Sequence, residues 1–420
     1  MRKTLLVITL IVVCTGLLFA GGAENKINTG AGYARFPAKA TECKKTDAVF
    51  HNPAGTAFMK DGLYVEAGNQ FLYKKYTNKV NGETYKTDVP SLLYPDFTIV
   101  WKKDRTALFT GFTVESGGGE LKYKDGNAQT VGLLGQMAAQ AGVPAIAGLG
   151  HSMNVYSAVY TSTTGVAHQF WEDHLSIGAG VRFLYGQQKL KVSLDDAPGP
   201  YAPGPYAQIF GPDKTLAETE TSGWGVGGVL GIHFKPIETV DIAATYHTQA
   251  IVDYKCTKAD GNFANVLGLE KGEHYNYALP AYLALGVGWQ IIPQLYVAAE
   301  FNYYYNKLAQ KAAEKPLKYD YNDSWEIALA AEYQINKMIA VSLGGFYSDI
   351  GGNSKDDGNS FVNPALNCFT YCGGVGLTFF DDLTIDIGAF YAPYFEKTWR
   401  NVKLDKTIFE GAISVTYRFF

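Results

Sequence analysis

The sequence has little charge of either sign and no long apolar run beyond its first twenty residues. Charged residues make up 18% of the 420 positions and the net charge is −4, whereas an ordinary soluble domain is roughly 25% charged. The chain lacks the excess of cations that neutralises phosphates, which excludes a basic nucleic-acid-binding protein. After Ala20, no uninterrupted apolar stretch approaches the ~18 residues of a membrane-spanning helix. Membrane helices are therefore not expected.

Cysteine is also scarce. The five cysteines are Cys14, Cys43, Cys256, Cys368 and Cys372. Cys368 and Cys372 are four residues apart on a predicted strand, so about 13 Å separates them and they cannot form a disulfide with each other. The pairing of the other cysteines stays open. Because the sequence has no Cys-x-x-Cys pair and no His-rich cluster, we expect no metal site and no cofactor.

The residues that are abundant favour strands. The chain has 46 Gly, 29 Tyr and 24 Phe, and 47% of its residues are hydrophobic. Tyr and Phe are enriched in strands, and a chain this apolar is not disordered. The composition predicts an all-β protein.

The first twenty residues predict export. Arg2 and Lys3 precede an uncharged stretch that ends at Ala20-Gly21, the pattern of a secretory signal peptide over residues 1–20. A membrane anchor is the alternative, but the stretch is shorter than the ~20 residues that span a bilayer. Cleavage at Cys14, as in a lipoprotein, is disfavoured because Val13 is not a small residue.

Alternation of apolar and other residues with period two dominates the rest of the chain, as in half-buried strands. The apolar sets include Leu175, Ile177, Ala179, Val181, Phe183 and Tyr185; Val240, Ile242, Ala244 and Tyr246; Leu295, Val297, Ala299, Phe301 and Tyr303; Trp325, Ile327, Leu329, Ala331 and Tyr333; and Leu383, Ile385, Ile387, Ala389 and Tyr391.

Short turns alternate with long connections between these runs. Turns are predicted near residues 102–105, 168–173, 235–238, 292–294, 335–337 and 381–382, and long connections near 76–90, 124–150, 193–221, 254–276, 309–320, 351–365 and 397–404. This pattern gives fourteen strands over residues 63–420. An even strand number with short turns at one end is typical of an antiparallel outer-membrane β-barrel. A secreted sandwich or propeller is the alternative, but its strands usually run only ~5–6 residues.

Aromatic residues support the barrel. Trp101, Trp171 and Trp289 lie near the short-turn ends of their strands, whereas Trp224, Trp325 and Trp399 lie near the long-loop ends. Two such groups are expected to form the girdles at the two membrane interfaces. The last strand alternates up to Phe420 and resembles the terminal signal read by the barrel assembly machinery.

The alternation also predicts which charged side chains face the lumen. If the apolar sets face lipid, the inward set contains Arg182, Asp241, His247, Glu300, Glu326, Glu332 and Asp386. A cation facing lipid at the membrane midplane would cost roughly 2–4 kcal/mol. Arg182 is the cation best placed to meet a cargo carboxylate, although pairing with a wall or plug carboxylate is favoured.

Residues 21–62 do not alternate, and they contain the string Asp47-Ala48-Val49-Phe50-His51-Asn52-Pro53-Ala54-Gly55. An N-terminal stretch that ends in this string before fourteen strands resembles the FadL/TodX (OmpP1-like) family of outer-membrane transporters for long-chain fatty acids and aromatic hydrocarbons. The resemblance implies that residues 21–62 form a hatch inside the barrel, with Asn52, Pro53, Ala54 and Gly55 as its motif. An ordinary tight turn is the alternative.

The resemblance further implies capture of hydrophobic compounds by exterior loops and lateral release into the bilayer beside a kinked third strand. Gly117, Gly118 and Gly119 lie in the third predicted strand, where glycines readily bulge or break a ladder. In the connection at 124–150, Leu133, Leu134 and Met137 are candidates for a capture groove. A bulge without a transport role, and a short helix packed on the barrel mouth, are the respective alternatives.

Three other functions compete with uptake of fatty acids or related hydrocarbons. A general diffusion porin has an equally polar inner wall but does not need a plug. An outer-membrane enzyme needs a nucleophile and a base at a recognisable spacing, which the scattered Ser and His residues do not supply. An adhesive barrel would act through its loops. The expected partners are hydrophobic small molecules, outer-membrane lipid and the assembly machinery, and the resemblance suggests a monomer.

Overall fold

The computed structural model describes residues 30–87, 89–140, 150–171, 173–195, 214–261, 264, 269–312, 322–351 and 361–420, with the side chains of 136–140 left out. The predicted signal peptide at residues 1–20 lies outside this range. Five helices occur in the described part of the chain. They are α3 (Ala31–Arg35), α4 (Ala48–His51), η2 (Pro53–Phe58), α5 (Ala128–Gln140) and α7 (Asn306–Ala312).

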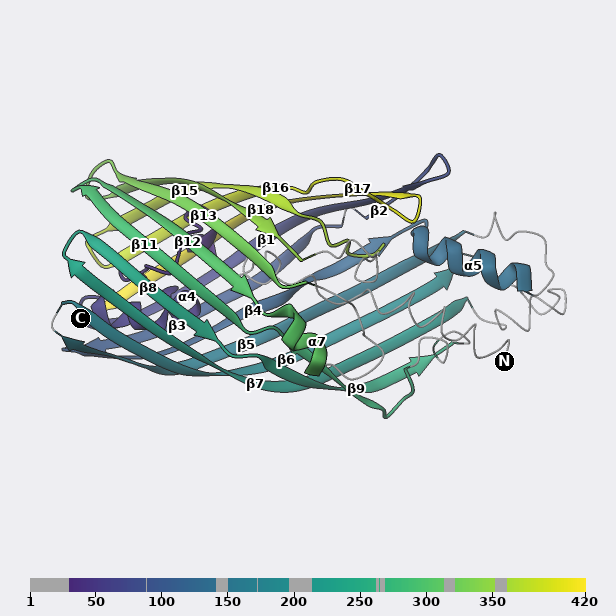
Figure 1. The fold of residues 1–420 in the computed structure, drawn as a ribbon, viewed down its shortest axis with the longest axis horizontal. Coiled ribbons are helices and arrows are strands. Elements are labelled where there is room, and N and C mark those ends of the chain that lie inside the picture. The colour runs from purple at the N-terminus through teal and green to yellow at the C-terminus, as the bar shows by residue number, and fades with distance from the viewer. Residues whose placement is uncertain are drawn as a thin grey trace.

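Strands make up most of the remainder and form one antiparallel sheet (Figure 1). They are β1 (Gly62–Val80), β2 (Glu83–Thr87), β3 (Ser91–Lys103), β4 (Thr106–Tyr123), β5 (His151–Trp171), β6 (Leu175–Leu194), β7 (Thr215–Ile237), β8 (Val240–His247), β9 (Ala250–Asp260), β10 (His274–Leu279), β11 (Tyr282–Ile292), β12 (Leu295–Tyr304), β13 (Ser324–Gln334), β14 (Ile339–Asp349), β15 (Cys368–Phe379), β16 (Leu383–Pro393), β17 (Lys397–Trp399) and β18 (Val402–Phe419).

The sheet closes on itself as a barrel. Its first and last strands, β1 and β18, pair from Leu63↔Phe419 to Lys79↔Lys403. The 18 strands of the described residues amount to fourteen barrel strands, because β2 with β3, β8 with β9, β10 with β11, and β16 with β17 are pieces of single strands. Closure gives every barrel strand a partner strand on each side, so the sheet has no edge strand, as a membrane favours. The predicted fourteen-stranded all-β barrel is confirmed.

The faces of the wall follow the predicted alternation. Apolar residues of the predicted outward sets, such as Val181, Ile327 and Leu329, are exposed on the outer face. The predicted inward residues Arg182, Asp241, His247, Glu300, Glu326 and Asp386 are all buried, and Glu332 contacts the N-terminal segment. A one-residue register slip would place these charges in lipid, so the alternation determines the register.

Two predicted long connections are wrong. Residues 76–90 form a hairpin in which β1 extends to Val80 and returns as β2 through Asn81-Gly82, both at positive φ. Residues 397–404 form a second hairpin, β17 to β18, through Arg400-Asn401, also at positive φ. Asn-Gly is a strong hairpin signal, because both central residues of the favoured turn need positive φ. Both hairpins extend the wall beyond its neighbours (Figure 1).

One girdle tryptophan was assigned wrongly. Trp101, Trp171, Trp224 and Trp289 are exposed on the outer face, but Trp399 is only 6% exposed and packs on Phe361 with 4.5 Å between ring centroids. Because β17 belongs to a hairpin above the barrel, Trp399 turns inward onto the segment that covers the mouth.

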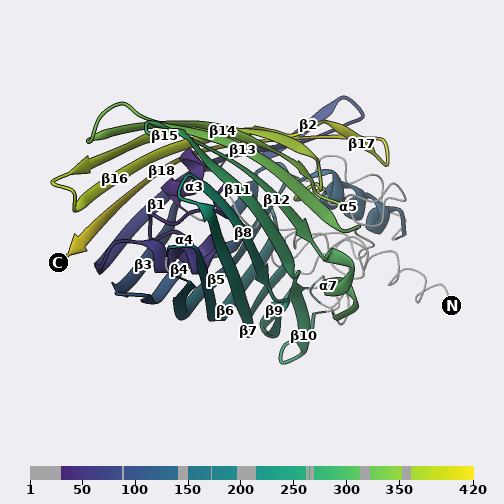
Figure 2. The same ribbon diagram turned by 60° about the vertical axis from the view of Figure 1, so that its left-hand side comes forward.

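The described part of the N-terminal segment lies inside the barrel, in the half nearer the short turns (Figure 2). α3 contacts β14, β15, β16, β18 and β1, whereas η2 contacts β3, β4, β5, β6 and β7. The segment therefore contacts opposite parts of the wall. We call residues 30–61 the hatch from here on.

No helix in the described residues is long and apolar enough to cross a membrane.

Candidate functional site

The predicted motif Asn52–Gly55 forms a tight turn at the centre of the hatch. Asn52 Oδ1 accepts a hydrogen bond from the Ala54 amide at 3.2 Å, and Pro53 is the first residue of η2. Asparagine is a favoured cap and proline suits the first helical position, since its missing N–H would have no partner there. Asn52 Nδ2 donates to Ala40 O at 2.9 Å and to Ile232 O at 3.2 Å. The motif thus joins the hatch to the barrel wall.

Two wall glycines make room for this turn. Gly178 of β6 and Gly231 of β7 are direct partners in the ladder. A β-carbon at Gly178 would lie 2.5 Å from the Ala54 nitrogen, and one at Gly231 would lie 2.1 Å from Asn52 Oδ1. The neighbouring Ser176 donates a hydrogen bond to Ala54 O at 2.7 Å. The turn therefore lies directly against the backbone of the wall.

Asp386 of β16 joins the hatch to the opposite side of the barrel. Its carboxylate pairs with Arg35 Nη1 at 2.7 Å and with Lys45 Nζ at 2.6 Å. Arg35 also pairs with Glu332 of β13. Asp386 is 2% exposed, so these contacts are shielded from water. Hatch and wall are therefore joined by buried charges, whose separation exposes uncompensated charge and is costly.

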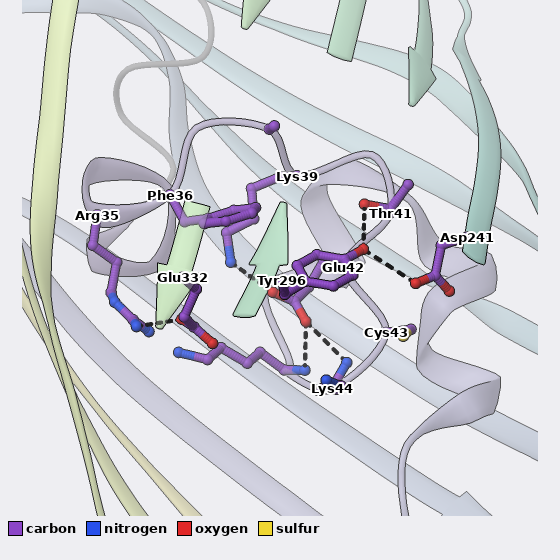
Figure 3. A pocket seen from close by; sticks show the side chains of 12 residues that line it. Arg35, Phe36, Lys39, Thr41, Glu42, Cys43, Lys44, Asp241, Tyr296 and Glu332 are labelled. Carbon is purple, nitrogen blue, oxygen red and sulfur yellow. Dashed lines mark hydrogen bonds and ion pairs between the residues drawn. The ribbon is translucent and has the colours of Figure 1, made fainter. Parts of the chain in front are cut away.

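Within the hatch, Lys39 lies between two carboxylates. Its Nζ is 2.8 Å from Glu42 Oε2 (Figure 3). The same Nζ is 2.8 Å from Asp47 Oδ2. Burial alone would lower the pKa of Lys39, but the two carboxylates outweigh it and raise that pKa above its usual value. Burial alone would raise the pKa of Glu42, but Lys39 and Lys45 outweigh it and hold that pKa well below its usual range. Both groups are charged at neutral pH.

A cavity of about 60 Å³ lies between the hatch and the wall, lined by residues that include Arg35, Glu42, Asp241 and Tyr296 (Figure 3). The Tyr296 hydroxyl lies 3.1 Å from Asp241 Oδ2 and 2.9 Å from Thr41 Oγ1 of the hatch. This space holds at most a few water molecules. The hatch therefore leaves no passage for a solute here.

Next to the cavity, the structure brings Cys43 of the hatch together with two residues of the wall, His233 and Asp241. One ligand atom from each of Cys43, His233 and Asp241 lies within 4.8 Å of the others. Lys235 Nζ lies 3.6 Å from the same Asp241 oxygen that His233 contacts at 2.8 Å. Burial raises the pKa of the Cys43 thiol to about 11, so the thiol is neutral at pH 7. Lys235 supplies the positive charge, and we interpret the cluster as a polar contact between hatch and wall.

The four cysteines after the predicted signal peptide are free and buried. Cys368 and Cys372 both lie on β15, paired with Ser348 and Gly344 of β14. The prediction that they do not pair with each other is confirmed.

The predicted glycines lie at a break in β4. The register between β4 and β5 shifts between Val114 and Ser116 and again between Ser116 and Gly119, and Gly117 and Gly119 have positive φ. A β-carbon at Gly117 would lie 2.3 Å from Ser157 O. Only glycine fits such a conformation and contact.

The ladder between β3 and β4 ends before this break. Its pairs run from Lys103↔Thr106 to Phe97↔Phe112 and no further. Beyond Phe97, β3 stays paired with β1 as far as Ser91, with one register shift. β4 stays paired with β5 as far as Tyr123, across its two register shifts. Within the described chain, β3 and β4 therefore do not pair with each other over the stretch of β4 that contains Gly117, Gly118 and Gly119. We call this stretch the β3–β4 gap.

Arg182 lies in the lumen close to this break. It forms an ion pair with Glu115 of β4, and its Nη1 donates weakly to Thr248 O at 3.4 Å. Glu115 also accepts a hydrogen bond from Thr161 Oγ1 at 2.7 Å. The favoured alternative, that Arg182 pairs with a wall carboxylate, therefore describes the structure, and a contact with cargo stays a prediction.

The predicted capture loop contains helix α5, which packs on the barrel mouth. Leu134 is buried in an apolar cluster with wall residues such as Leu121 and Met153, and Leu133 is half-buried. Ala128 N donates to Asn78 Oδ1 of β1 at 3.2 Å. The Met137 side chain lies outside the described residues. Residues 361–366 join the same cover, since Tyr123 Oη donates to Val362 O at 2.8 Å.

Sequence reasoning missed most of the hatch contacts. Arg35, Lys39 and Lys45 lie in a segment without periodicity, so no pattern showed which wall residues they would meet. The alternation of inward and outward residues along the strands did place Asp386 and Glu332 in the lumen. The signal that was available is the opposite charge of the two parts, because the hatch is basic and the inner wall is acidic.

The sequence profile of the family described as outer membrane protein transport protein (OMPP1/FadL/TodX) matches residues 11–417. None of the curated proteins compared with the sequence matches it.

Solved structures share the fold at low sequence identity. A FadL homologue from Pseudomonas aeruginosa is 15% identical, with 94% of this chain and 98% of that chain covered and a TM-score of 0.66. The Pseudomonas putida toluene transporter TodX is 17% identical, with 93% and 98% covered and a TM-score of 0.66. The Ralstonia pickettii toluene transporter TbuX is 17% identical, with 95% and 100% covered and a TM-score of 0.63.

The profile match covers nearly the whole sequence, and the closed fourteen-stranded barrel agrees with it. This chain belongs to the OMPP1/FadL/TodX family of outer membrane transport proteins.

Proposed function

We propose that this protein takes up hydrophobic compounds, namely long-chain fatty acids or related hydrocarbons, across the outer membrane. Residues 1–20 direct export, residues 21–62 form the plug that contains the hatch, and residues 63–420 form the barrel. Cargo is captured by the exterior loops, among which Leu133, Leu134 and Met137 supply apolar surface. The hatch, with Asn52, Pro53, Ala54 and Gly55 at its centre, gates passage, and cargo leaves sideways into the bilayer near Gly117, Gly118 and Gly119.

The main structural support for this proposal is the β3–β4 gap. The hatch contacts strands on opposite sides of the barrel, and the cavity between hatch and wall beside Asp241 is only about 60 Å³. A straight passage to the short-turn end therefore requires the hatch to move. The gap lies above the hatch, where β3 and β4 share no backbone hydrogen bonds. An apolar molecule that leaves through the wall there enters lipid without crossing water, which favours its release.

The cargo class is supported by the relatives. Two structures that share the fold are described as toluene transporters and a third as a FadL homologue. Residues inside the barrel mouth agree with an apolar cargo, since Leu121, Met153, Val155, Leu190 and Leu194 form a buried apolar cluster there. Long-chain fatty acids and small aromatic hydrocarbons both fit this lining.

Transport without catalysis is part of the proposal. The protein acts as a monomer in outer-membrane lipid, and its last strand, which pairs with β1 and ends at Phe419, is the segment that the barrel assembly machinery reads. Transfer follows the gradient of the cargo and the free energy of burying its apolar surface.

Binding and uptake of two cargoes test the proposal. The folded full-length barrel is titrated with oleate and with toluene, and uptake is followed in proteoliposomes, alongside a variant that lacks residues 21–55. Saturable binding of either cargo, with uptake changed by loss of the hatch, supports a gated hydrophobe transporter, and the preferred cargo identifies the substrate class. If neither binds and the intact protein conducts ions steadily, the protein is a general diffusion porin.

A further inference from the structure

Lys74 of β1 points into the β3–β4 gap. Its Nζ donates hydrogen bonds to the carbonyl oxygen of Gly118, to that of Glu120 at 2.9 Å and to Ser91 Oγ at 2.8 Å. Gly118 and Glu120 lie on β4, and Ser91 begins β3. One ammonium group therefore bridges the two strands at the place where they lack backbone pairing.

The carbonyl groups that Lys74 contacts belong to the break. β3 does not pair with β4 beyond Phe112, and the β5 register passes from Ser116 directly to Gly119. A buried carbonyl without a donor is costly in free energy, so a donor from another strand stabilises the open ladder. Lys74 is that donor, and it holds the kink in its present form.

Lys74 differs in its partners from the buried lysines Lys39 and Lys102, and it resembles buried Lys406, whose Nζ donates to the neutral Asn363 Oδ1 at 2.9 Å. Lys39 is paired with Glu42 and Asp47, and Lys102 is paired with Asp61 at 3.0 Å. Lys74 is 2% exposed, and no carboxylate in the described part of the chain forms an ion pair with it. Burial of an ammonium whose acceptors are all neutral is unfavourable unless an anion joins it.

An apolar cluster lies on β1, β3, β4 and β5 next to this part of the wall. Leu72, Tyr94, Val114 and Ala158 form a buried cluster, with Tyr156 and Tyr160 packed against it. Leu72 precedes Lys74 on the same inward face of β1, and Val114 immediately precedes the first register shift of β4. A single positive group beside an apolar surface fits a molecule with one anionic head and an apolar tail.

We propose that Lys74 is a carboxylate-binding residue at the β3–β4 gap, where it selects cargo with a carboxylate head over neutral hydrocarbons. A carboxylate forms a stronger, charge-assisted hydrogen bond with the ammonium than the carbonyls do. When Lys74 turns to the cargo, the carbonyls of Gly118 and Glu120 lose their donor and the break can widen. This inference rests on the proposed lateral route. It implies that the gap loosens when the cargo arrives.

The test compares an acid and its neutral ester in Lys74→Met. Binding and proteoliposome uptake of oleate and methyl oleate are measured for the wild type, Lys74→Met and the matched control Lys102→Met, which removes a buried lysine that already has a carboxylate partner. We expect Lys74→Met to weaken oleate binding on the order of tenfold to a hundredfold, with methyl oleate changed much less. Lys102→Met should leave the acid-to-ester ratio at its wild-type value.

The Lys74→Arg variant distinguishes the effect of the positive charge from the effect of the local structure. Arginine keeps the cation, so it should retain the preference for the acid even if the kink shifts, and heat-dependent gel mobility reports whether each variant folds. An unchanged acid-to-ester ratio in folded Lys74→Met, or equal losses for both cargoes, overturns the inference while leaving hydrophobe uptake intact. If Lys74→Met does not fold, loss of the acid preference in folded Lys74→Arg overturns the inference. If the wild type binds neither cargo, the proposed function fails and this inference fails with it.

Discussion

Gly231 of β7 is in direct contact with Asn52 of the hatch, and a β-carbon at Gly231 would lie 2.1 Å from Asn52 Oδ1. Asn52 in turn donates a hydrogen bond to Ile232 O, the next carbonyl along the same strand. The position of the hatch therefore depends on the absence of one side chain as well as on hydrogen bonds. A wall without this glycine could not hold the turn at this depth.

Gly231→Val should displace the hatch. A larger residue in a packed contact costs about 1–3 kcal/mol, which raises the population of the displaced hatch by roughly 5-fold to 150-fold. Cys43 is buried in the hatch and serves as a native reporter. Its alkylation, read by peptide mass spectrometry, should accelerate by that factor. The control is Gly411→Val, because Gly411 has open space at its β-carbon position. Equal alkylation in both variants would contradict a packing role for Gly231.

Asp386→Asn should also loosen the hatch, because it removes the carboxylate that contacts both Arg35 and Lys45. Loss of one member of a buried ion pair costs about 3–5 kcal/mol, so Cys43 alkylation should increase by more than in Gly231→Val. The control is Glu396→Gln, whose 2.7 Å pair with Lys403 is exposed. Such surface pairs contribute about 0–1 kcal/mol. A wild-type rate in Asp386→Asn would show that this pair does not hold the hatch.

The ion pair of Arg182 with Glu115 should position β4 rather than bind cargo. We expect Arg182→Met and Glu115→Gln to change uptake of oleate and toluene by similar factors. The double variant should be no more impaired than either single one, because the two groups act as a unit. Uptake assays with both cargoes measure this coupling. A selective loss of oleate uptake in Arg182→Met alone would instead place the cargo carboxylate at Arg182.

The hatch should stay closed across a wide pH range and loosen at both extremes. The pKa of Glu42 is lower in the folded protein than in the unfolded chain, so its contribution is present above about pH 4.3 and is lost as the pH falls below that value. The pKa of Lys39 is raised, so its contribution is present below about pH 10.4 and is lost as the pH rises through the folded value.

Ion conductance in planar bilayers tests this range. Opening events should be rare at pH 7 and should become more frequent below about pH 4. Glu42→Gln should open frequently already at pH 7 and respond less to acid, because the titrating group is gone. An acid response in Glu42→Gln equal to that of the wild type would assign the effect to other carboxylates.

Much of the fold could be predicted because its cause is local. Alternation along each strand separates lipid-facing Val181 and Leu329 from luminal Arg182 and Asp386, and this separation determines the register of the wall. The two hairpins at Asn81-Gly82 and Arg400-Asn401 were missed because their polar residues were interpreted as loops. Because this second hairpin was interpreted as a loop, Trp399 was placed at a long-loop end and assigned to a girdle. Its strand instead leaves the membrane-facing wall.

The sequence by itself determined the barrel, its strand number and the inward set of charges, because the period of a strand and the cost of charge in lipid act residue by residue. Only the tertiary structure decided which hatch cations meet Asp386, that Gly178 and Gly231 face Asn52 and Ala54, and that Lys74 lies in the β3–β4 gap. These contacts join segments up to 351 positions apart. Their geometry arises when the wall closes around the hatch, and no local pattern encodes that closure.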